Sequence, residues 1–113
     1  MIIHKELAAS GRWFKFSLME QLANIGCDVD RAVRWRNKGD IDMSNHALYR
    51  ALELIDFTVA DPKNRNHRLR ELCRMRDTLK DYFMDKNIYQ SNDKSWDAYF
   101  YYFSYKAALE RGR

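Results

Sequence analysis

Glycine and proline are scarce in this sequence, which has four glycines and one proline among 113 residues. A β-sandwich or β-barrel needs many tight turns, and these two residue types are the ones that most often form them. The same scarcity leaves no glycine-rich phosphate loop, no dinucleotide fingerprint and no Gly-x-Ser-x-Gly nucleophile elbow. The composition therefore argues against an all-β fold and excludes the enzymes that depend on such loops, and we expect no cofactor.

Long apolar runs and clusters of metal ligands are also missing. Charged residues recur every few positions, so no segment reaches the roughly 18 apolar residues of a membrane span, and the first six residues meet a charge before a signal-peptide core forms. Three histidines and two cysteines are scattered singly, whereas metal sites need them clustered. We expect no metal site, no membrane association and a cytoplasmic protein in which Cys27 and Cys73 are free, buried thiols.

The composition supports one folded domain. Hydrophobic residues make up 46% and aromatic residues 14% of the chain, far from the low hydrophobicity and high net charge of disordered sequences. A chain of this length falls within the usual size of a single domain, roughly 100–150 residues, and no shift in composition divides it. We therefore predict a single domain over residues 1–113.

Apolar residues recur at three- and four-residue steps after Ser17, which is the pattern of an amphipathic helix. Ser17 and Glu20 have the spacing of a capping box, in which each side chain satisfies a backbone N–H at the start of a helix. The apolar stripe runs to Gly39, a natural helix stop. Gly26 interrupts the stripe, and we expect it to allow close approach of another helix.

Three further amphipathic stretches follow, separated by short connections. Each begins near a residue suited to cap a helix. The predicted caps are Ser44 for the second helix, Asp61 before Pro62 for the third, and Ser91 or Ser95 for the fourth, after a polar loop over 85–95.

Four consecutive helices with short connections predict an all-α fold, an antiparallel up-and-down four-helix bundle. Residues 1–16 lack a clear period, so we expect an irregular N-terminal lead-in that packs through Trp13, Phe14 and Phe16.

The formal net charge of +4 is too modest to require nucleic acid, but the charge is unevenly distributed. Residues 62–76 hold six basic residues and one acid. Two interpretations stay open: the arginines bind phosphate or a partner, or they form a solvated face paired with acids such as Glu53, Asp56 and Asp61. Candidate binding residues are Arg65, Arg68, Arg70, Arg74 and Arg76 on the third helix, and Arg31 and Arg34 on the first.

Arg76 occupies a position in the apolar stripe of the third helix, and two explanations stay open for it. It is either a partly buried residue paired with Asp56 or Asp30, or a ligand-binding residue.

The fourth helix is unusually rich in aromatic residues. One helix cannot bury six aromatics in seven positions against a single core, so some must face a partner or solvent. We expect a homodimer interface there, with packing against the aromatic lead-in and a binding groove as the alternatives. The candidate interface residues are Trp96, Tyr99, Tyr101, Tyr102 and Tyr105.

The third helix ends in residues 76–83, RDTLKDYF, and this segment resembles the end of HEPN helical-bundle domains. The motif of that family is an arginine, four to six residues, a histidine, one residue and a tyrosine. Arg76 stands at the arginine position and Asp81 takes the place of the histidine. Tyr82 lies near the tyrosine position, because it follows Asp81 directly and the one residue that should separate them is missing. The preceding helix is also similar, so the resemblance covers residues 44–84.

The resemblance implies a small, often dimeric bundle and, in the ribonucleases of the family, an arginine that steadies the scissile phosphate beside a histidine that moves protons. An aspartate in place of the histidine would repel that phosphate, so we expect RNA cleavage to be absent or weak. Residues 61–65 are similar to a turn in an uncharacterised prokaryotic helical family, which implies no activity.

The sequence favours a non-enzymatic binding module with a basic contact face on its third helix and a protein or a nucleic acid as its partner. Two alternatives stay open. One is a HEPN-like RNA-processing nuclease, or its inactive relative, with Arg76 as the phosphate ligand; the other is a nucleic-acid-binding protein without chemistry. No catalytic residue is predicted, and the nearby carboxylates Asp77 and Asp81 are expected to form solvated salt bridges.

Overall fold

The computed structural model describes residues 11–112, and every regular element among them is helical. The elements are η1 (Arg12–Lys15) and η2 (Pro62–Asn64), which are short 3-10 helices, and the α-helices α2 (Leu18–Asn37), α3 (Ile41–Ala60), α4 (Arg68–Met84) and α5 (Asp93–Arg111). The predicted all-α, four-helix fold is confirmed, and residues 11–112 contain no strand.

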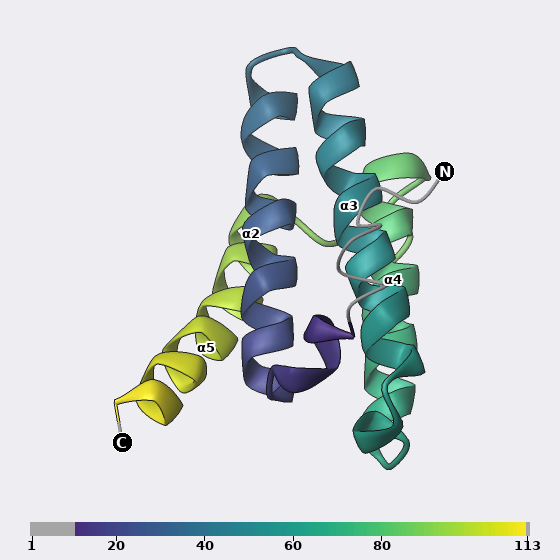
Figure 1. Ribbon diagram of the computed structural model, residues 1–113. Helices are drawn as coiled ribbons and strands as arrows, with labels where there is room; N and C mark the ends of the chain where they lie inside the picture. Colours follow the sequence, from purple (N-terminus) through teal and green to yellow (C-terminus); the bar gives the residue numbers. More distant parts are fainter. Residues whose placement is uncertain (1–10, 113) are drawn as a thin grey trace.

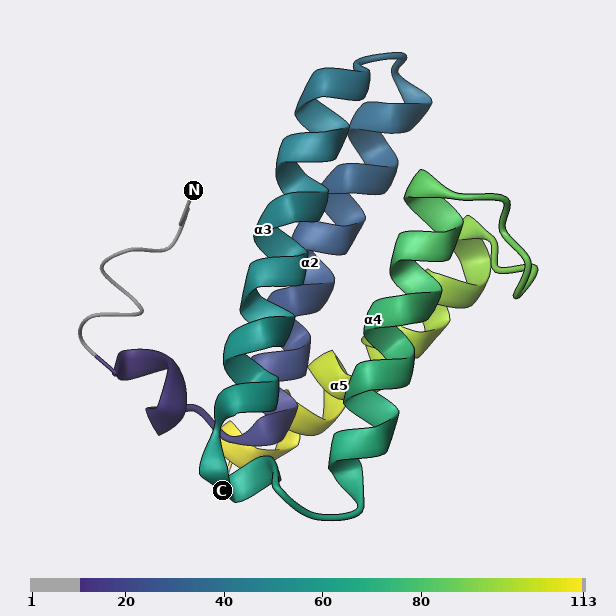
Figure 2. The ribbon, with the colours of Figure 1, turned by 90° about the vertical axis from the view of Figure 1, so that its right-hand side faces the viewer.

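The centre of the bundle is the antiparallel pair α2 and α3, joined by a tight turn (Figure 1). α4 packs along α3, whereas α5 crosses α2 obliquely, so the two outer helices lie against different members of the central pair (Figure 2). The tilt of α5 opens grooves on both of its sides, which hold the sites described below.

The start of α2 and its contact with α5 agree with the sequence. The Ser17 hydroxyl accepts the Glu20 N–H at 3.2 Å, and the Glu20 carboxylate accepts the Ser17 N–H at 3.0 Å, which completes the capping box. A Cβ added to Gly26 would lie 2.7 Å from Cβ of Phe100 on α5. Gly26 therefore allows the close helix approach that the sequence predicted.

The predicted start of α3 is wrong by one turn. Asp40 caps this helix by accepting the Met43 N–H at 3.0 Å. Ser44 lies inside the helix, where its buried hydroxyl donates to the carbonyl of Ala32 on α2 at 2.8 Å. A serine that suits an N-cap thus serves as a link between two helices instead.

The predicted start of α4 is also too early. Asp61 does cap a helical turn that begins at Pro62, but this turn is the 3-10 helix η2 and it ends at Asn64. The buried side-chain amide of Asn64 donates to the Thr58 carbonyl at 2.9 Å, which anchors the chain at that point. The α-helix therefore begins only at Arg68.

Neither serine predicted as the cap of α5 has that role. Asn92 is the N-cap and accepts the Ser95 N–H at 2.8 Å, while Ser95 returns a bond to the Asn92 N–H at 3.0 Å. Ser95 is thus the third helical residue and the partner of the N-cap in a capping box, a position where a glutamate or glutamine is more usual.

The hydrophobic core lies between α2 and α3 and extends to the two outer helices. Ile25, Leu48, Ile55 and Leu79 are completely buried in it. The predicted burial of the two cysteines is wrong, because Cys27 and Cys73 are free but exposed. Both lie beside the apolar stripe of their helix, and one residue of offset is enough to turn a helical side chain toward solvent.

The described part of the lead-in packs through its aromatics, as predicted, whereas residues 1–10 lie outside the described residues. Trp13 is buried and its ring meets that of Phe16 edge to face, but Phe14 is exposed. The indole N–H of Trp13 donates to the Thr58 hydroxyl at 3.0 Å, which holds η1 against the end of α3.

A buried polar network joins η1, α2 and η2. The side-chain amide of Gln21 donates to the Trp13 carbonyl at 3.1 Å and to Asp61 at 2.9 Å, and its carbonyl accepts from Asn64 at 3.1 Å. Burial raises the pKa of Asp61, but the ion pair with Lys63 and the bond from Gln21 outweigh burial and leave the pKa below its ordinary value. We call Gln21, Asp61, Lys63 and Asn64 the polar clasp.

Candidate functional site

The predicted basic face consists of arginines that form ion pairs and arginines that do not. Arg65, Arg70 and Arg74 are exposed and form no ion pair with any residue in 11–112. Arg70 and Arg74 lie one turn apart on the outer side of α4, and Arg65 lies in the segment that leads into this helix. We call these three residues the basic patch.

Arg76 belongs to the paired group. Its Nε donates to Asp56 on α3 at 2.7 Å, and a second nitrogen lies 3.4 Å from the other carboxylate oxygen. This is one of the two pairings that the sequence allowed. The guanidinium thus joins α4 to α3 at the edge of the core, which explains an arginine in an apolar stripe.

Three more of the predicted arginines have a carboxylate neighbour on their own helix. The pairs are Arg31 with Asp28 (2.6 Å), Arg34 with Asp30 (2.9 Å) and Arg68 with Glu71 (3.9 Å). The contact of Arg68 is long and leaves its side chain 41% exposed, so this residue still adds positive charge beside the basic patch.

Positive charge at the start of α4 opposes the usual preference of a helix. The N-terminus of a helix carries partial positive charge and is stabilised by acidic side chains. Here Arg68 and Arg70 share the first turn with a single acid, Glu71, and the N-cap residue His67 forms no side-chain capping bond. The side chain of Asn66, one residue earlier, accepts the Arg68 N–H at 2.7 Å. This arrangement does not favour folding, but it concentrates positive potential at one end of the molecule.

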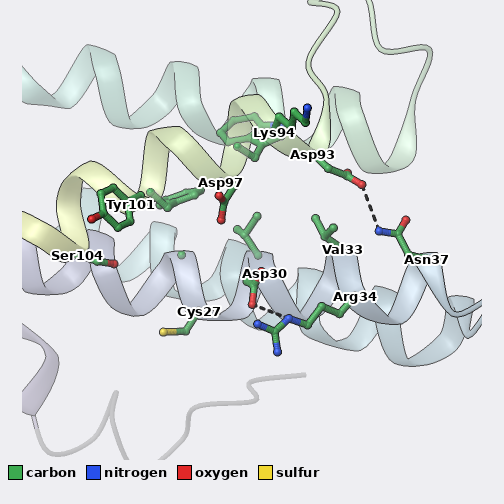
Figure 3. Close-up of a pocket in the computed structure, with 14 residues that line it drawn as sticks. Cys27, Asp30, Val33, Arg34, Asn37, Asp93, Lys94, Asp97, Tyr101 and Ser104 are labelled. Atoms are coloured by element: carbon green, nitrogen blue, oxygen red, sulfur yellow. Dashed lines mark hydrogen bonds and ion pairs between the residues drawn. The ribbon is translucent and has the colours of Figure 1, made fainter.

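A groove of about 510 Å³ lies between α2 and α5 (Figure 3). Its apolar residues include Val29, Val33, Trp96 and Phe100. Polar side chains from both helices surround them, and Figure 3 shows Asp97 pointing from α5 into the space between the helices. The groove exists because α5 touches α2 most closely at Gly26 and crosses it obliquely.

Four of the polar residues that line this groove are paired with each other. The side-chain amide of Asn37 donates to Asp93 at 3.2 Å, and Asp30 binds Arg34 (Figure 3). Asp97 and Lys94 form no ion pair with a residue in 11–112. No sequence pattern indicates this groove, although Gly26 predicts the close helix contact beside it.

A second groove, of about 300 Å³, lies between α4 and the start of α5. Met75, Trp96 and Tyr99 form its apolar wall, and Arg74 of the basic patch lies at its edge with Glu71. The indole nitrogen of Trp96 is buried and has no hydrogen-bond partner among residues 11–112. Burial, with a smaller contribution from the charge of Glu71, raises the pKa of Tyr99 to about 12.

Arg36, Tyr82 and Asp93 form a cluster that joins three helices. Arg36 on α2 donates to the Tyr82 hydroxyl at 2.7 Å and to Asp93 at 2.9 Å, and the Tyr82 hydroxyl donates to Asp93. The guanidinium also lies 4.6 Å from the centre of the Tyr82 ring. Hydrogen bonding from Tyr82, despite partial burial, lowers the pKa of Asp93.

Contrary to the sequence prediction, no solvated salt bridge forms within residues 11–112 at Asp77 or, one turn later, at Asp81. Asp81 is 7% exposed, and its two carboxylate oxygens accept the N–H groups of Ile88 at 2.9 Å and Tyr89 at 3.0 Å. The Asp81 carboxylate therefore holds the loop between α4 and α5. Arg76 faces α3 instead, so the residues at the arginine and histidine positions of the HEPN motif have separate partners.

The five aromatics predicted as an interface separate into two groups. Trp96 is buried at 6% exposure and Tyr99 is half-buried, so both belong to the interior of the bundle. Tyr101, Tyr102 and Tyr105 are 69%, 53% and 53% exposed. They lie with Ala98, Ala108 and Leu109 on the outer side of α5, and we call these six residues the outer face of α5.

Comparison with protein-family models, with curated proteins and with solved structures gives no match to this chain. Within residues 11–112, no helix combines the length and apolar character that a membrane crossing requires. The same residues contain no group of three or more histidine, cysteine, aspartate or glutamate side chains arranged to hold a metal ion.

Proposed function

We propose that this chain is a non-enzymatic binding module that contacts a phosphate-bearing partner through the basic patch. The observation that carries the proposal is the contrast among the seven arginines predicted to bind: four of them have carboxylate partners, whereas Arg65, Arg70 and Arg74 have none within residues 11–112. A partner that supplies anions would complete these three.

The residue type points to phosphate. The patch consists of arginine, whose planar guanidinium binds phosphate with two parallel hydrogen bonds and is weakly hydrated. Each phosphate that such a residue neutralises releases counterions and adds to the salt dependence of binding. Nucleic acid presents phosphates in a regular row, which suits two arginines one turn apart on α4 and a third in the segment before it.

We propose also that the module acts as a homodimer in the cytoplasm. The outer face of α5 supports the dimer because it places three exposed tyrosines next to one another on a helix whose opposite side is already buried in the core. Tyrosine is enriched in protein interfaces, and pairs related by a two-fold axis are the commonest assemblies.

Fluorescence anisotropy of a labelled single-stranded RNA of mixed sequence tests the basic patch. For three phosphate contacts we expect the logarithm of the binding constant to fall with the logarithm of salt concentration with a slope of about −2. The double variant R70A/R74A should bind more weakly and lower that slope to about −0.7, because two contacts are lost.

The variant R34A/K38A is the matched control. It removes two exposed positive charges, Arg34 on α2 and Lys38 at the C-cap of that helix, and Arg34 is already paired with Asp30. We expect it to bind RNA as the unmodified protein does. Equal losses in the two double variants, or binding that does not depend on salt, would contradict a specific role of the patch.

The HEPN-like nuclease is the second candidate, and it is supported by the resemblance of residues 76–83. The same RNA, recovered after incubation and separated by size, distinguishes the two proposals. We expect it to stay intact, because Arg76 is bound to Asp56 and Asp81 is bound to loop amides. Cleavage that disappears in Arg76→Ala would favour the nuclease.

A further inference from the structure

We infer that two copies of this chain pair through the outer face of α5 in an antiparallel arrangement, with the two-fold axis beside residue 103. This inference rests on the proposed homodimer and states which surface forms it and in which orientation.

The exposed residues of α5 have the spacing of a coiled-coil seam. Ala98, Tyr101, Tyr105 and Ala108 follow one another at steps of three, four and three residues, which are the steps of the core positions in a two-helix coiled coil. All four are exposed, so none is used by the core of the chain. α5 therefore has a second seam over residues 98–108, opposite the one formed by its buried residues.

The seam is symmetric about its centre. Read in either direction, it has an alanine, a tyrosine, a tyrosine and an alanine, and residue 103 is the midpoint. In an antiparallel pair, Ala98 of one copy meets Ala108 of the other, and Tyr101 meets Tyr105. The alanines at both ends of the seam let the two helices approach closely, and the four tyrosine rings at its centre then lie within reach of one another.

Charge selects the antiparallel orientation over the parallel one. Asp97 lies near the beginning of α5 and Arg111 at its end, on the same side of the seam by the 100° step of the helix. Neither has an ion-pair partner among residues 11–112. Antiparallel pairing brings each Asp97 near Arg111 of the second copy, whereas parallel pairing leaves these two residues at opposite ends of the interface.

The area of the outer face of α5, which has three tyrosines in each copy, predicts a weak dimer. Each tyrosine buries about 150–250 Å² when fully covered, and six rings that are half to two-thirds exposed offer on the order of 600–900 Å². Stable interfaces bury roughly 1,200–2,000 Å² in total. We therefore expect a dimer that dissociates on dilution within the micromolar range.

The second copy would also change the groove between α2 and α5. Tyr101 belongs to the seam and Asp97 lies beside it, and both residues also line that groove. Antiparallel pairing adds Arg111 of the second copy to the rim beside Asp97. The groove is then bounded by both copies.

The first measurement is sedimentation equilibrium of the full chain at several concentrations. We expect a mass that rises from one copy toward two, and a Tyr101→Lys variant that stays monomeric because it buries a charge in the seam. Tyr49→Lys is the matched control, since Tyr49 is 47% exposed on α3 and should leave the dimer intact. Circular dichroism shows that both variants fold.

The second measurement fixes the orientation. In a C27S/C73S background, which removes the two exposed native thiols, A98C and A108C proteins of different mass are mixed and treated with a short bis-maleimide crosslinker. Antiparallel pairing predicts crosslinks between A98C and A108C and almost none within A98C alone.

The possible results separate the inference from the proposed homodimer. A monomer at every concentration overturns both. A dimer that survives Tyr101→Lys keeps the homodimer but overturns its assignment to α5. A dimer that is lost in Tyr101→Lys but crosslinks A98C to A98C keeps the surface and overturns the antiparallel orientation.

Discussion

Gly26 on α2 lies directly against Phe100 on α5, so closely that there is no room for a side chain between them. A Cβ at Gly26 would be 2.7 Å from the Phe100 Cβ and 2.9 Å from its Cγ. Phe100 is 5% exposed, and its ring stacks on that of Trp96. This contact sets how deeply α5 packs on α2.

Gly26→Ala is expected to destabilise the protein by about 1–3 kcal/mol, because the added methyl group forces the two helices apart. Urea denaturation followed by circular dichroism measures the free energy of unfolding. Helix propensity alone would give the opposite sign, since alanine is better than glycine in a helix by about 1 kcal/mol. A more stable variant would therefore show that the contact with Phe100 is not tight.

The contact between α2 and α5 shows what the sequence contains and what it does not. The heptad-like apolar steps and the capping box predict α2 correctly because both depend only on neighbours within one helix. Gly26 indicated a close contact, but not which helix would make it. The identity of the partner, Phe100, depends on the tilt of α5, which results from the packing of the whole bundle.

Removing the Asp81 carboxylate is expected to release the loop between α4 and α5. Asp81→Ala leaves the N–H groups of Ile88 and Tyr89 without their acceptor, and bonds to a charged group contribute about 1.5–3 kcal/mol each. Hydrogen exchange at these two amides should become faster, and the free energy of unfolding should fall by about 2 kcal/mol or more.

Asp77→Ala is the matched control on the same helix. Asp77 is exposed and has no ion-pair partner among residues 11–112, so exchange at Ile88 and Tyr89 should not change. Asp81→His restores the residue type of the HEPN motif, but we expect it to loosen the loop in the same way. If Asp81→His were as stable as the unmodified protein, the carboxylate would not be an anchor.

The candidate site was only partly predictable for a related reason. Six basic residues within 62–76 indicated a basic face, but the sequence could not tell which of them meet an acid from another helix. Arg76 reaches Asp56 across the gap between α4 and α3, and their separation of 20 residues carries no local signal. Only three arginines of that set lack a carboxylate partner in the described structure.

Tyr99 should make the protein less stable in alkaline solution. Burial, with the charge of Glu71, raises its pKa to about 12, whereas a tyrosine in the unfolded chain loses its proton near pH 10. The protonated Tyr99 hydroxyl thus makes its full contribution to the free energy of unfolding below pH 10, and this contribution is lost as the pH rises toward 12. Tyr99→Phe should reduce the loss of unfolding free energy between these two values.

The variant Glu71→Gln tests the cause of the raised pKa. It removes the negative charge that contributes to the shift, so the ultraviolet titration of Tyr99 should move to lower pH while remaining above that of an unburied tyrosine. A titration that does not move would show that burial acts alone.

Asp61 in the polar clasp should make the protein sensitive to acid. Its bonds from Lys63 and Gln21 lower its pKa, and the unfolded chain has the ordinary value of 3.8, so the unfolded state binds a proton first as the pH falls. The ionised Asp61 carboxylate therefore contributes its full share of the free energy of unfolding above pH 3.8, and this contribution disappears as the pH drops through the lowered pKa. Urea midpoints from pH 7 down to pH 2 measure this loss.

Asp61→Asn separates the charge of the clasp from its shape. The amide keeps the size of the side chain but forms no ion pair with Lys63, so the variant should be less stable than the unmodified protein at pH 7 and should approach it in stability near pH 2. Asp77→Asn, at an exposed position, should follow the unmodified protein at every pH. If the difference between Asp61→Asn and the unmodified protein stayed constant with pH, the clasp would owe its stability to packing and neutral hydrogen bonds, and the charge of Asp61 would contribute nothing.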